Sequence, residues 1–208
     1  QSFPIEPKTN VLWISNPHNP TGQLWSSSSI ENLLANYKLV ICDEAFISLV
    51  PGGEKQSIIE LTKIYKNLIV IRSLTKFLGI AGLRVGYAVT NSDRLLRWQA
   101  IRDPWPVNTL AINATYMIMK DSKMHKKRLK KIHRWVEEEG KWLFNNLSDF
   151  SAIKPLPSTT NFQLIKSDNS TLNLIENLKK RGILLRDCRS FSNLGENWIR
   201  ISLQKRKQ

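Results

Sequence analysis

The sequence predicts an α/β protein in which a mainly parallel sheet is followed by a small α+β unit. In the first part of the chain, short apolar runs rich in branched side chains alternate with amphipathic stretches, which is typical of buried parallel strands and their connecting helices. The last part holds further strand-like runs around one helical stretch. With 208 residues, 41% of them hydrophobic, the chain is long enough to bury a core.

Four apolar runs are expected to form the strands of the first sheet. They are VLWIS (11–15), KLVICDEA (38–45), LIVIRSL (68–74) and RVGYAV (84–89). Between the first two, residues 26–37 begin with serines that can cap a helix, and Ile30, Leu33 and Leu34 follow on one side. Residues 52–65 show a similar spacing, so we expect a second helix there.

Residues 91–147 are predicted to be largely helical, with a break at DPWP (103–106), where two prolines interrupt backbone hydrogen bonding. Within them, residues 120–144 combine apolar residues at helical spacing with many lysines and arginines. This pattern indicates an amphipathic helix with a basic, solvated face.

The small unit is expected to contain three strands and one helix. The strands are predicted at 161–166, 183–188 and 198–203, and the helix at about 171–181. We place the boundary near SAIKPLPSTT, residues 151–160. The expected domains are therefore 1–150, a large domain with connecting helices, and 151–208, a small C-terminal α+β domain.

The formal net charge of +14 favours an anionic partner. No helix-turn-helix, zinc-ligand spacing or aromatic-plus-basic RNA motif is present, so we do not expect nucleic acid. No run of about 18 apolar residues occurs, so we do not expect a membrane. Small phosphates and carboxylates remain. Of two cysteines, Cys42 and Cys188, the first lies in an apolar run as a buried free thiol, which favours a cytoplasmic protein.

Three polar clusters follow or end the predicted buried strands. NPHNPTG (16–22) follows the first strand, Asp43 and Glu44 end the second, and residues 73–76 follow the third. In an open parallel sheet, ligands bind at the carboxyl ends of the strands. We therefore expect the three clusters to share one crevice.

The residue types in these clusters suit one kind of ligand. The hydroxyls of Ser73 and Thr75, together with Arg84, suit a phosphate. An aspartate at a strand end, Asp43, can hold a protonated ring nitrogen, and Lys76 can react with an aldehyde. Pyridoxal 5'-phosphate carries all three groups, so it is the expected cofactor.

In their order and spacing, the motifs NPHNPTG, DEA, SLTK and GLRVG resemble those of the fold-type I, class I/II aminotransferase family of pyridoxal phosphate enzymes. The resemblance runs from about Val11 to Leu203. It implies a partial large domain that binds the cofactor and a small C-terminal domain. Family members usually carry a further N-terminal part, so we expect a fragment or a truncated gene product, and a homodimer for the full-length protein.

The resemblance assigns roles to the residues of these motifs. Lys76 would form the Schiff base with the cofactor, and Asp43 would be the partner of its pyridinium nitrogen. Asn19 would hydrogen-bond the phenolic oxygen. Ser73 and Arg84 would hold the phosphate.

Two arginines of the small domain are the expected substrate ligands. Arg200 of WIRIS matches the arginine with which the family grips the substrate carboxylate. Arg186 of ILLRDC is a second candidate, for the carboxylate or for a phosphate. The alternative interpretation of Arg186 is an exposed arginine at the end of an edge strand.

Within the family, the runs DEAFISLVPG, RSLTKFLGIAGLRVGY, DPWPVNTLA and GILLRDCRSF look most like threonine-phosphate decarboxylases of cobalamin biosynthesis. Phe46 stands where many aminotransferases have tyrosine, and Trp105 favours the same group. We expect decarboxylation of L-threonine O-3-phosphate to aminopropanol phosphate. An aminotransferase such as the histidinol-phosphate type is the first alternative, and a non-catalytic fragment or basic binding protein is the second.

None of the three histidines is expected to be catalytic. His125 and His133 lie on the predicted basic helix, where a surface position is expected, while His18 lies inside NPHNP and could touch a substrate phosphate. Neither helical histidine has a carboxylate or cysteine at ligand spacing, so no metal site is expected.

Overall fold

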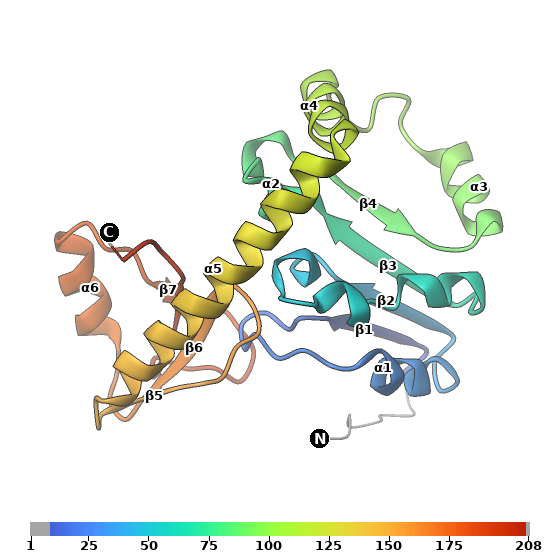
Figure 1. Ribbon diagram of the computed structural model, residues 1–208. Helices are drawn as coiled ribbons and strands as arrows, with labels where there is room; N and C mark the ends of the chain where they lie inside the picture. The colour runs from blue at the N-terminus through green and yellow to red at the C-terminus, as the bar shows by residue number, and fades with distance from the viewer. Residues whose placement is uncertain (1–8, 207–208) are drawn as a thin grey trace.

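The computed structural model describes residues 9–206, which form two four-stranded sheets connected through a long helix (Figure 1). The first sheet contains, in spatial order, β1 (Val11–Ser15), β2 (Leu39–Asp43), β3 (Leu68–Ser73) and β4 (Gly86–Val89). The first three strands are parallel, and β4 runs antiparallel beside β3. The expected class, a mainly parallel sheet followed by a small α+β unit, is confirmed.

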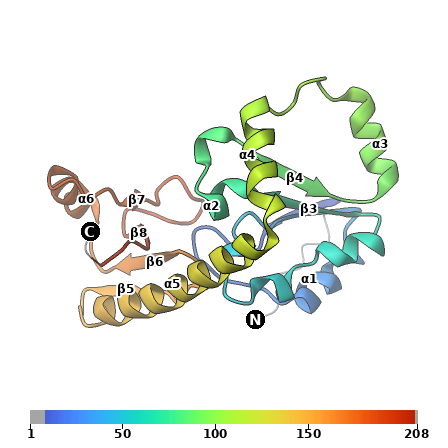
Figure 2. The same ribbon diagram turned by 45° about the horizontal axis from the view of Figure 1, so that its top comes forward.

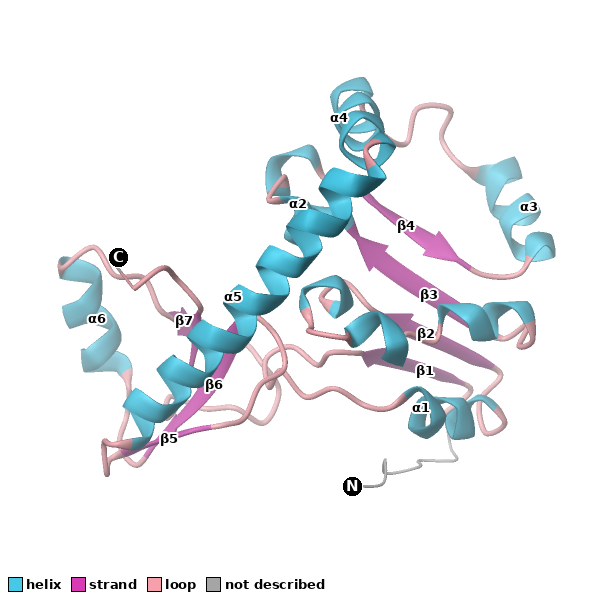
Figure 3. Cartoon of the chain, viewed as in Figure 1, coloured by secondary structure: helices cyan, strands magenta, loops and turns pink. Residues whose placement is uncertain are grey.

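Helices alternate with the strands of this sheet, as Figure 3 shows by colour. They include α1 (Ser27–Leu34), α2 (Leu74–Leu78), α3 (Ser92–Ile101) and α4 (Thr109–Lys120). Short 3-10 helices lie between them, at η1 (Ile47–Leu49), η2 (Gly53–Gln56), η3 (Ile59–Lys63) and η4 (Ala81–Leu83). The break predicted at 103–106 falls between α3 and α4, where the two prolines end the helical bonding.

The core of the first sheet forms where α1 packs against it. The hydroxyl of Ser26 accepts a hydrogen bond from the backbone N–H of Ser29 (3.1 Å) and so caps the helix. The helical face then meets alternate residues of the strands, and the buried cluster comprises Ile14, Ile30, Leu33, Leu34, Tyr37, Val40, Cys42, Ile58, Leu68 and Val70. Cys42 is buried and free, as expected.

The helix predicted over 52–65 is wrong. Instead, η2 and η3 are separated by Ser57, whose backbone is extended (φ −66°, ψ 138°). The Ser57 hydroxyl donates to Glu44 Oε2 (2.8 Å), and the backbone N–H of Ile58 donates to Glu44 Oε1 (2.9 Å). The buried carboxylate takes the backbone donor that a continuous α-helix would need for itself, so the helix breaks there.

A buried ion pair lies beyond the apolar core, at the carboxyl ends of β2 and β3. Arg72 is 6% exposed and Glu44 is 1% exposed, and Arg72 Nε lies 2.7 Å from Glu44 Oε2. Burial raises the pKa of Glu44, although the neighbouring Arg72 cation opposes that shift. At this end of the sheet, the buried side chains are therefore a charged pair and not apolar residues.

The second sheet is antiparallel throughout its described strands. Its spatial order is β5 (Ile153–Pro155), β6 (Phe162–Ser167), β8 (Trp198–Ser202) and β7 (Arg186–Asp187). Figures 1 and 2 both show β6 between α6 (Leu172–Lys180) and α5 (Ser122–Ser148). The strand predicted over 183–188 shortens to β7, because the N–H of Ile183 donates to Leu178 O (2.9 Å) at the end of α6.

Helix α5 runs from α4 to the second sheet and packs against both parts of the chain (Figure 1). The expected surface position of its histidines is wrong, since both are only partly exposed. His133 Nε2 lies 3.1 Å from the carbonyl oxygen of Ser48, and the His125 ring packs against Phe77 with centroids 5.0 Å apart. Both histidines thus attach α5 to the first part. Within residues 9–206, no helix is both long and apolar enough to cross a membrane.

The core assignment predicts a contrast between two isoleucine-to-alanine changes. Ile30 is 0% exposed, whereas Ile101 in α3 is 84% exposed. Ile30→Ala is expected to lower the free energy of unfolding by about 2–5 kcal/mol, because it removes buried methyl groups and leaves a cavity. Ile101→Ala should change it by less than about 0.5 kcal/mol. Urea unfolding of both variants measures the difference, and equal losses would contradict the assignment.

Candidate active site

The carboxyl ends of β1, β2 and β3 meet at one edge of the first sheet. Ser15 is the register partner of Asp43, and Asp43 is the register partner of Ile71. The N–H of Asn16 donates to Asp43 O (2.8 Å), and the N–H of Glu44 donates to Ile71 O (2.8 Å). The three predicted polar clusters therefore start side by side, as the parallel topology requires.

Lys76 lies in the short helix α2, directly after β3. Its Nζ donates to the hydroxyl of Thr75 (3.3 Å), and that hydroxyl lies 2.7 Å from the hydroxyl of Ser73. Lys76 Nζ also lies 5.6 Å from the centroid of the Phe46 ring. Phe46 follows the end of β2, so the lysine on one strand end reaches the loop that follows the other.

Asp43, at the end of β2, is partly buried. Its Oδ1 accepts a hydrogen bond from the backbone N–H of Ala45 (2.9 Å). This bond orients the carboxylate, and no residue in the described part of the chain donates to Oδ2. The second oxygen can therefore accept a hydrogen bond from a ligand.

Arg84 lies in the turn between η4 and β4, next to Ser73. Gly86 is the register partner of Ser73, and a Cβ on Gly86 would lie 2.7 Å from Arg72 O, so glycine permits the close approach of β3 and β4. Arg84 itself has left-handed backbone geometry (φ 51°), and its exposed guanidinium donates to Ala81 O (3.1 Å). The turn that carries Arg84 therefore adjoins the end of β3, but the Arg84 side chain points to Ala81 and makes no hydrogen bond to Ser73 or Thr75.

Arg200 in β8 crosses from the second sheet to the first. Its Nη1 donates to Asn19 Oδ1, and its guanidinium stacks over the ring of Phe162, 4.8 Å from the centroid. Phe162 meets Phe46 edge to face, with centroids 5.2 Å apart. Contacts thus run without interruption from Lys76 through the two phenylalanines to Arg200 and Asn19.

The charge of Arg200 has no neutralising partner in the part of the chain that the structure describes. None of the ion pairs among residues 9–206 includes it, and its Nε is buried without a hydrogen-bond partner. Burial lowers the pKa of Arg200. An anion that bound to this partly buried, unpaired cation would form charge-assisted hydrogen bonds with it.

Arg186 in β7 is the register partner of Arg200. Its side chain is exposed, donates from Nη2 to Ser190 Oγ (2.8 Å) and stacks on Phe191 at 5.4 Å. Two cations opposite each other on neighbouring strands repel. An anionic ligand with two charged groups would relieve that repulsion.

Two further residues from the sequence motifs, His18 and Trp105, have no part in the contacts that run from Lys76 to Arg200 and Asn19. His18 is exposed, and its Nδ1 lies 2.8 Å from the hydroxyl of Thr21. Trp105 is 88% exposed, so the structure gives it no place among these side chains.

The pattern analysis missed Phe162 and Arg72. Phe162 begins a strand in the second sheet, and nothing local distinguishes it from an ordinary core aromatic. Arg72 had a usable signal, because an arginine inside the apolar run LIVIRSL must find a buried partner. Glu44, in the apolar run before it, is that partner.

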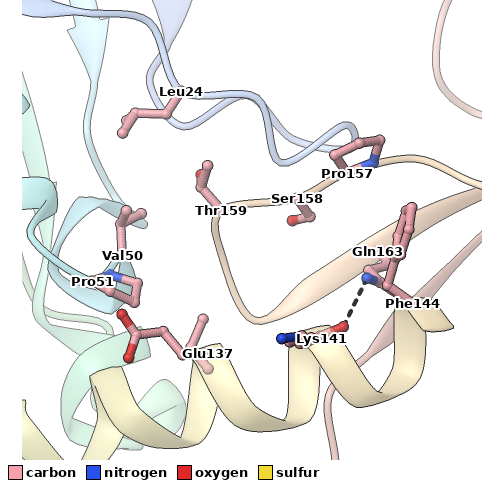
Figure 4. A pocket seen from close by; sticks show the side chains of 12 residues that line it. Leu24, Val50, Pro51, Glu137, Lys141, Phe144, Pro157, Ser158, Thr159 and Gln163 are labelled. Atoms are coloured by element: carbon pink, nitrogen blue, oxygen red, sulfur yellow. Dashed lines mark hydrogen bonds between the residues drawn. The ribbon is translucent and has the colours of Figure 1, made fainter.

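Among residues 9–206, no three His, Cys, Asp or Glu side chains are grouped so that they could hold a metal ion. A cavity of about 500 Å³ lies apart from the strand ends, between α5 and the loop after β5 (Figure 4). Thr159 in that loop donates from its N–H (2.9 Å) and its hydroxyl (2.8 Å) to Gly22 O. The loop that carries Asn19 is therefore also tied to the second sheet.

Comparison with known proteins gives one consistent family. The sequence matches the aminotransferase class I and II family over residues 3–208. A histidinol-phosphate aminotransferase from Halalkalibacterium halodurans is 28% identical over 207 residues, which are 98% of this chain and 54% of that protein. The chain thus spans about half the length of the curated relatives it matches.

Solved structures agree with the sequence matches. The histidinol-phosphate aminotransferase from Clostridium acetobutylicum superposes with a TM-score of 0.86 at 28% identity, over 95% of this chain and 60% of that one. The L-threonine-O-3-phosphate decarboxylase from Porphyromonas gingivalis gives 0.83 at 28% identity, over 96% and 61%. These two enzymes catalyse different reactions and superpose almost equally well, so the comparison supports the fold and does not distinguish between the reactions.

Arg200 and Arg72 should respond differently to the same substitution. Arg72→Met is expected to lower the free energy of unfolding by about 3–5 kcal/mol, because it leaves the Glu44 carboxylate buried without its cation. Arg200→Met removes a cation that has no carboxylate partner, so we expect a change below about 1 kcal/mol. Denaturant unfolding measures both. A loss in Arg200→Met as large as in Arg72→Met would show that Arg200 has a structural role.

Proposed function

Because the chain belongs to the aminotransferase class I and II family, we propose that it carries the cofactor lysine and substrate arginines of an enzyme acting on a phosphorylated amino acid. Pyridoxal 5'-phosphate is the cofactor of this family. When bound, it acts as an electron sink for the bonds at the amino acid's α-carbon. The residues of this chain have to hold it, orient it and move protons.

The donor and acceptor groups at the strand ends fit this cofactor. Asp43 Oδ2 is left to accept the ring N–H, because Oδ1 already bonds Ala45. Asn19 accepts from Arg200 through Oδ1, so its Nδ2 remains to donate to the phenolic oxygen. The amine of Lys76 contacts only a hydroxyl among its described hydrogen bonds, which leaves it available to bond the aldehyde.

The phosphate of the cofactor would lie at the start of α2. Ser73 and Thr75 present two hydroxyls 2.7 Å apart, and the turn that carries Arg84 adjoins Ser73 through the β3–β4 pairing. For Arg84 to contribute, its guanidinium has to leave the carbonyl of Ala81. That exchange is favourable, since a charge-assisted bond to phosphate is stronger than a bond to a neutral carbonyl.

The single observation that carries the proposal for the substrate is the unpaired guanidinium of Arg200 over Phe162. A carboxylate bound there would satisfy a charge that the protein leaves without a partner. Arg186 opposite it supplies a second cation, which suits a substrate that bears a carboxylate and a phosphate. Lys76, once free, lies on the same chain of contacts and can take or give a proton at the α-carbon.

For the reaction itself, we propose decarboxylation of L-threonine O-3-phosphate, as in cobalamin biosynthesis. Phe46 supports it: the ring lies between Lys76 and Phe162 and has no hydroxyl with which to bond the phenolic oxygen of the cofactor. The likeness to the Porphyromonas gingivalis decarboxylase supports it as well. Transamination of a histidinol-phosphate type substrate is the alternative, supported by the Halalkalibacterium halodurans relative.

We also propose that the complete enzyme is a cytoplasmic homodimer with a movable small domain, residues 151–208. Large apolar side chains on α3 and α4 support an interface on that side of the molecule, since Ile101 is 84% exposed and Leu110 is 73% exposed. Two contacts at the strand ends support the second part: the hydrogen bond from Arg200 to Asn19 and the ring contact of Phe162 with Phe46 both join the small domain to the large one beside the proposed site.

Titration with pyridoxal 5'-phosphate tests cofactor binding. The chain should develop a visible absorption band, and Lys76→Ala should abolish it, because the band requires a covalent link to the lysine amine. Lys126→Ala, on the exposed basic side of α5, is the matched control and should keep the band. A band that is equal in Lys76→Ala would contradict the assignment of the cofactor lysine.

The reaction is tested on any preparation that binds the cofactor. With L-threonine O-3-phosphate, the proposal expects release of CO2 without a keto acid, and a value of kcat/KM at least tenfold lower in Arg200→Met, because a charge-assisted bond is worth about 1.5–3 kcal/mol. Formation of a ketone phosphate from histidinol phosphate, with conversion of 2-oxoglutarate to glutamate and without CO2, would instead establish the aminotransferase.

A further inference from the structure

We propose that Arg72 and Glu44 are positioning residues: their buried ion pair, braced by Glu54 and Ser57, fixes the ends of β2 and β3 and so aims Asp43 and Ser73 at the cofactor. The inference rests on the proposed function for the roles of Asp43 and Ser73. Arg72 and Glu44 lie on the opposite face of the sheet from the side chains of Asp43 and Ser73.

Strand alternation places the pair directly behind the proposed cofactor site. Successive side chains of a strand point to opposite faces. On β2, Val40 and Cys42 point into the core under α1, and on β3, Leu68 and Val70 do the same. Glu44 and Arg72 continue these two rows on the core side. Asp43 and Ser73, one position away on each strand, must therefore point to the other side.

The network has more partners than a simple ion pair. Arg72 Nη1 and Nη2 donate to the two carboxylate oxygens of Glu54, each at 3.0 Å, and Nη2 also donates to Ser57 Oγ (2.7 Å). Ser57 in turn donates to Glu44 Oε2 (2.8 Å), and Ile58 N–H donates to Glu44 Oε1 (2.9 Å). Arg72 thus connects β3 to the loop that covers it, while Glu44 connects β2 to the same loop.

This arrangement is a costly way to obtain stability alone. The Glu44 carboxylate and the Arg72 guanidinium lie out of water, while the Glu54 side chain is 47% exposed. Replacing a buried ion pair with apolar side chains is often neutral or stabilising. The preceding pair on the same face of β2 and β3 consists of Cys42 and Val70, which belong to the apolar core. Apolar side chains are therefore already used next to the ion pair. What the polar network adds is direction, because a forked guanidinium fixes angles as well as distances.

The backbone and its hydrogen bonds connect the ion pair to Asp43 and Ser73. Glu44 N–H donates to Ile71 O (2.8 Å), which holds the end of β2 against β3. The next N–H, of Ala45, orients the Asp43 carboxylate (2.9 Å). On the other strand, Arg72 directly precedes Ser73, where β3 ends, and α2 begins at the next residue, Leu74. A shift of the Arg72–Glu44 pair would therefore move both the ring-nitrogen acceptor and the hydroxyl that precedes the lysine helix.

Hydrogen–deuterium exchange on the 208-residue chain, without cofactor, tests the positioning directly. Arg72→Lys keeps the charge but removes the fork. We expect peptides covering residues 43–46 and 72–77 to exchange at least about tenfold faster, which corresponds to about 1.4 kcal/mol of lost local stability. Val70→Ala is the matched control, since it removes buried atoms from the same strand and face, two residues earlier.

In the control, faster exchange should extend over the whole of β2 and β3 and not be concentrated at their ends. Unchanged exchange at 43–46 and 72–77 in Arg72→Lys, or the same pattern in both variants, would overturn the inference. If Arg72→Lys does not fold, Glu44→Gln takes its place, because the amide keeps the shape of the side chain and an acceptor for Ile58 N–H.

A second arm separates this inference from the proposed function. The affinity for pyridoxal 5'-phosphate should be about tenfold weaker in Arg72→Lys than in Val70→Ala, both measured where they are fully folded. Equal affinities in the two variants would overturn the inference while leaving the proposed function intact. Absence of cofactor binding in the unmodified chain would count against the proposed function at this length, and the exchange pattern would still decide the positioning role.

Discussion

The parallel alignment of β1, β2 and β3 determines which side chains can meet at the edge of the first sheet where these strands end. In this register the ends of the three strands lie next to one another, so that Asn16, Asp43 and Glu44 exchange backbone hydrogen bonds with neighbouring strands. Everything proposed for the site depends on this one constraint, because Asn19, Asp43 and Ser73 are separated along the chain and have no other reason to be neighbours. The alternation of side chains then places Asp43 and Ser73 on the face of the sheet opposite the one that packs against α1.

A second connection, between the sheets, brings Arg200 to the polar groups at the strand ends. Phe46 and Phe162 form an apolar contact between the parts of the chain, Arg200 lies over one of those rings, and its hydrogen bond reaches Asn19. One loop, residues 16–24, therefore meets the second sheet twice, at Asn19 and, through Thr159, at Gly22. Under the proposed function, an anion bound by Arg200 would compete with Asn19 for the guanidinium and would thereby couple substrate binding to the amide that is proposed to donate to the cofactor.

Much of this arrangement was predictable from the sequence, and the failures have physical causes. The strands of the first sheet, α1 and the break before α4 follow from local apolar patterns and prolines, and the convergence of the polar clusters follows from parallel topology. The helix expected over 52–65 failed because Glu44, distant in sequence, takes the backbone donor of Ile58. The contact of His125 with Phe77 and that of His133 with Ser48 could not be predicted. Helical periodicity does not distinguish a half-buried polar side chain that has a partner from the solvated lysines on the same helix. Phe162 could be recognised only from the way the two sheets pack.

The most direct test of the central claim is to trap the cofactor on the protein and locate it. The chain would be mixed with pyridoxal 5'-phosphate, reduced with borohydride, digested and analysed by peptide mass spectrometry. We expect a label concentrated on Lys76, because its amine lies at the strand ends, 3.3 Å from the Thr75 hydroxyl and 5.6 Å from the centroid of the Phe46 ring. A label spread over the exposed lysines of α5, such as Lys126 and Lys130, with no preference for Lys76, would contradict it.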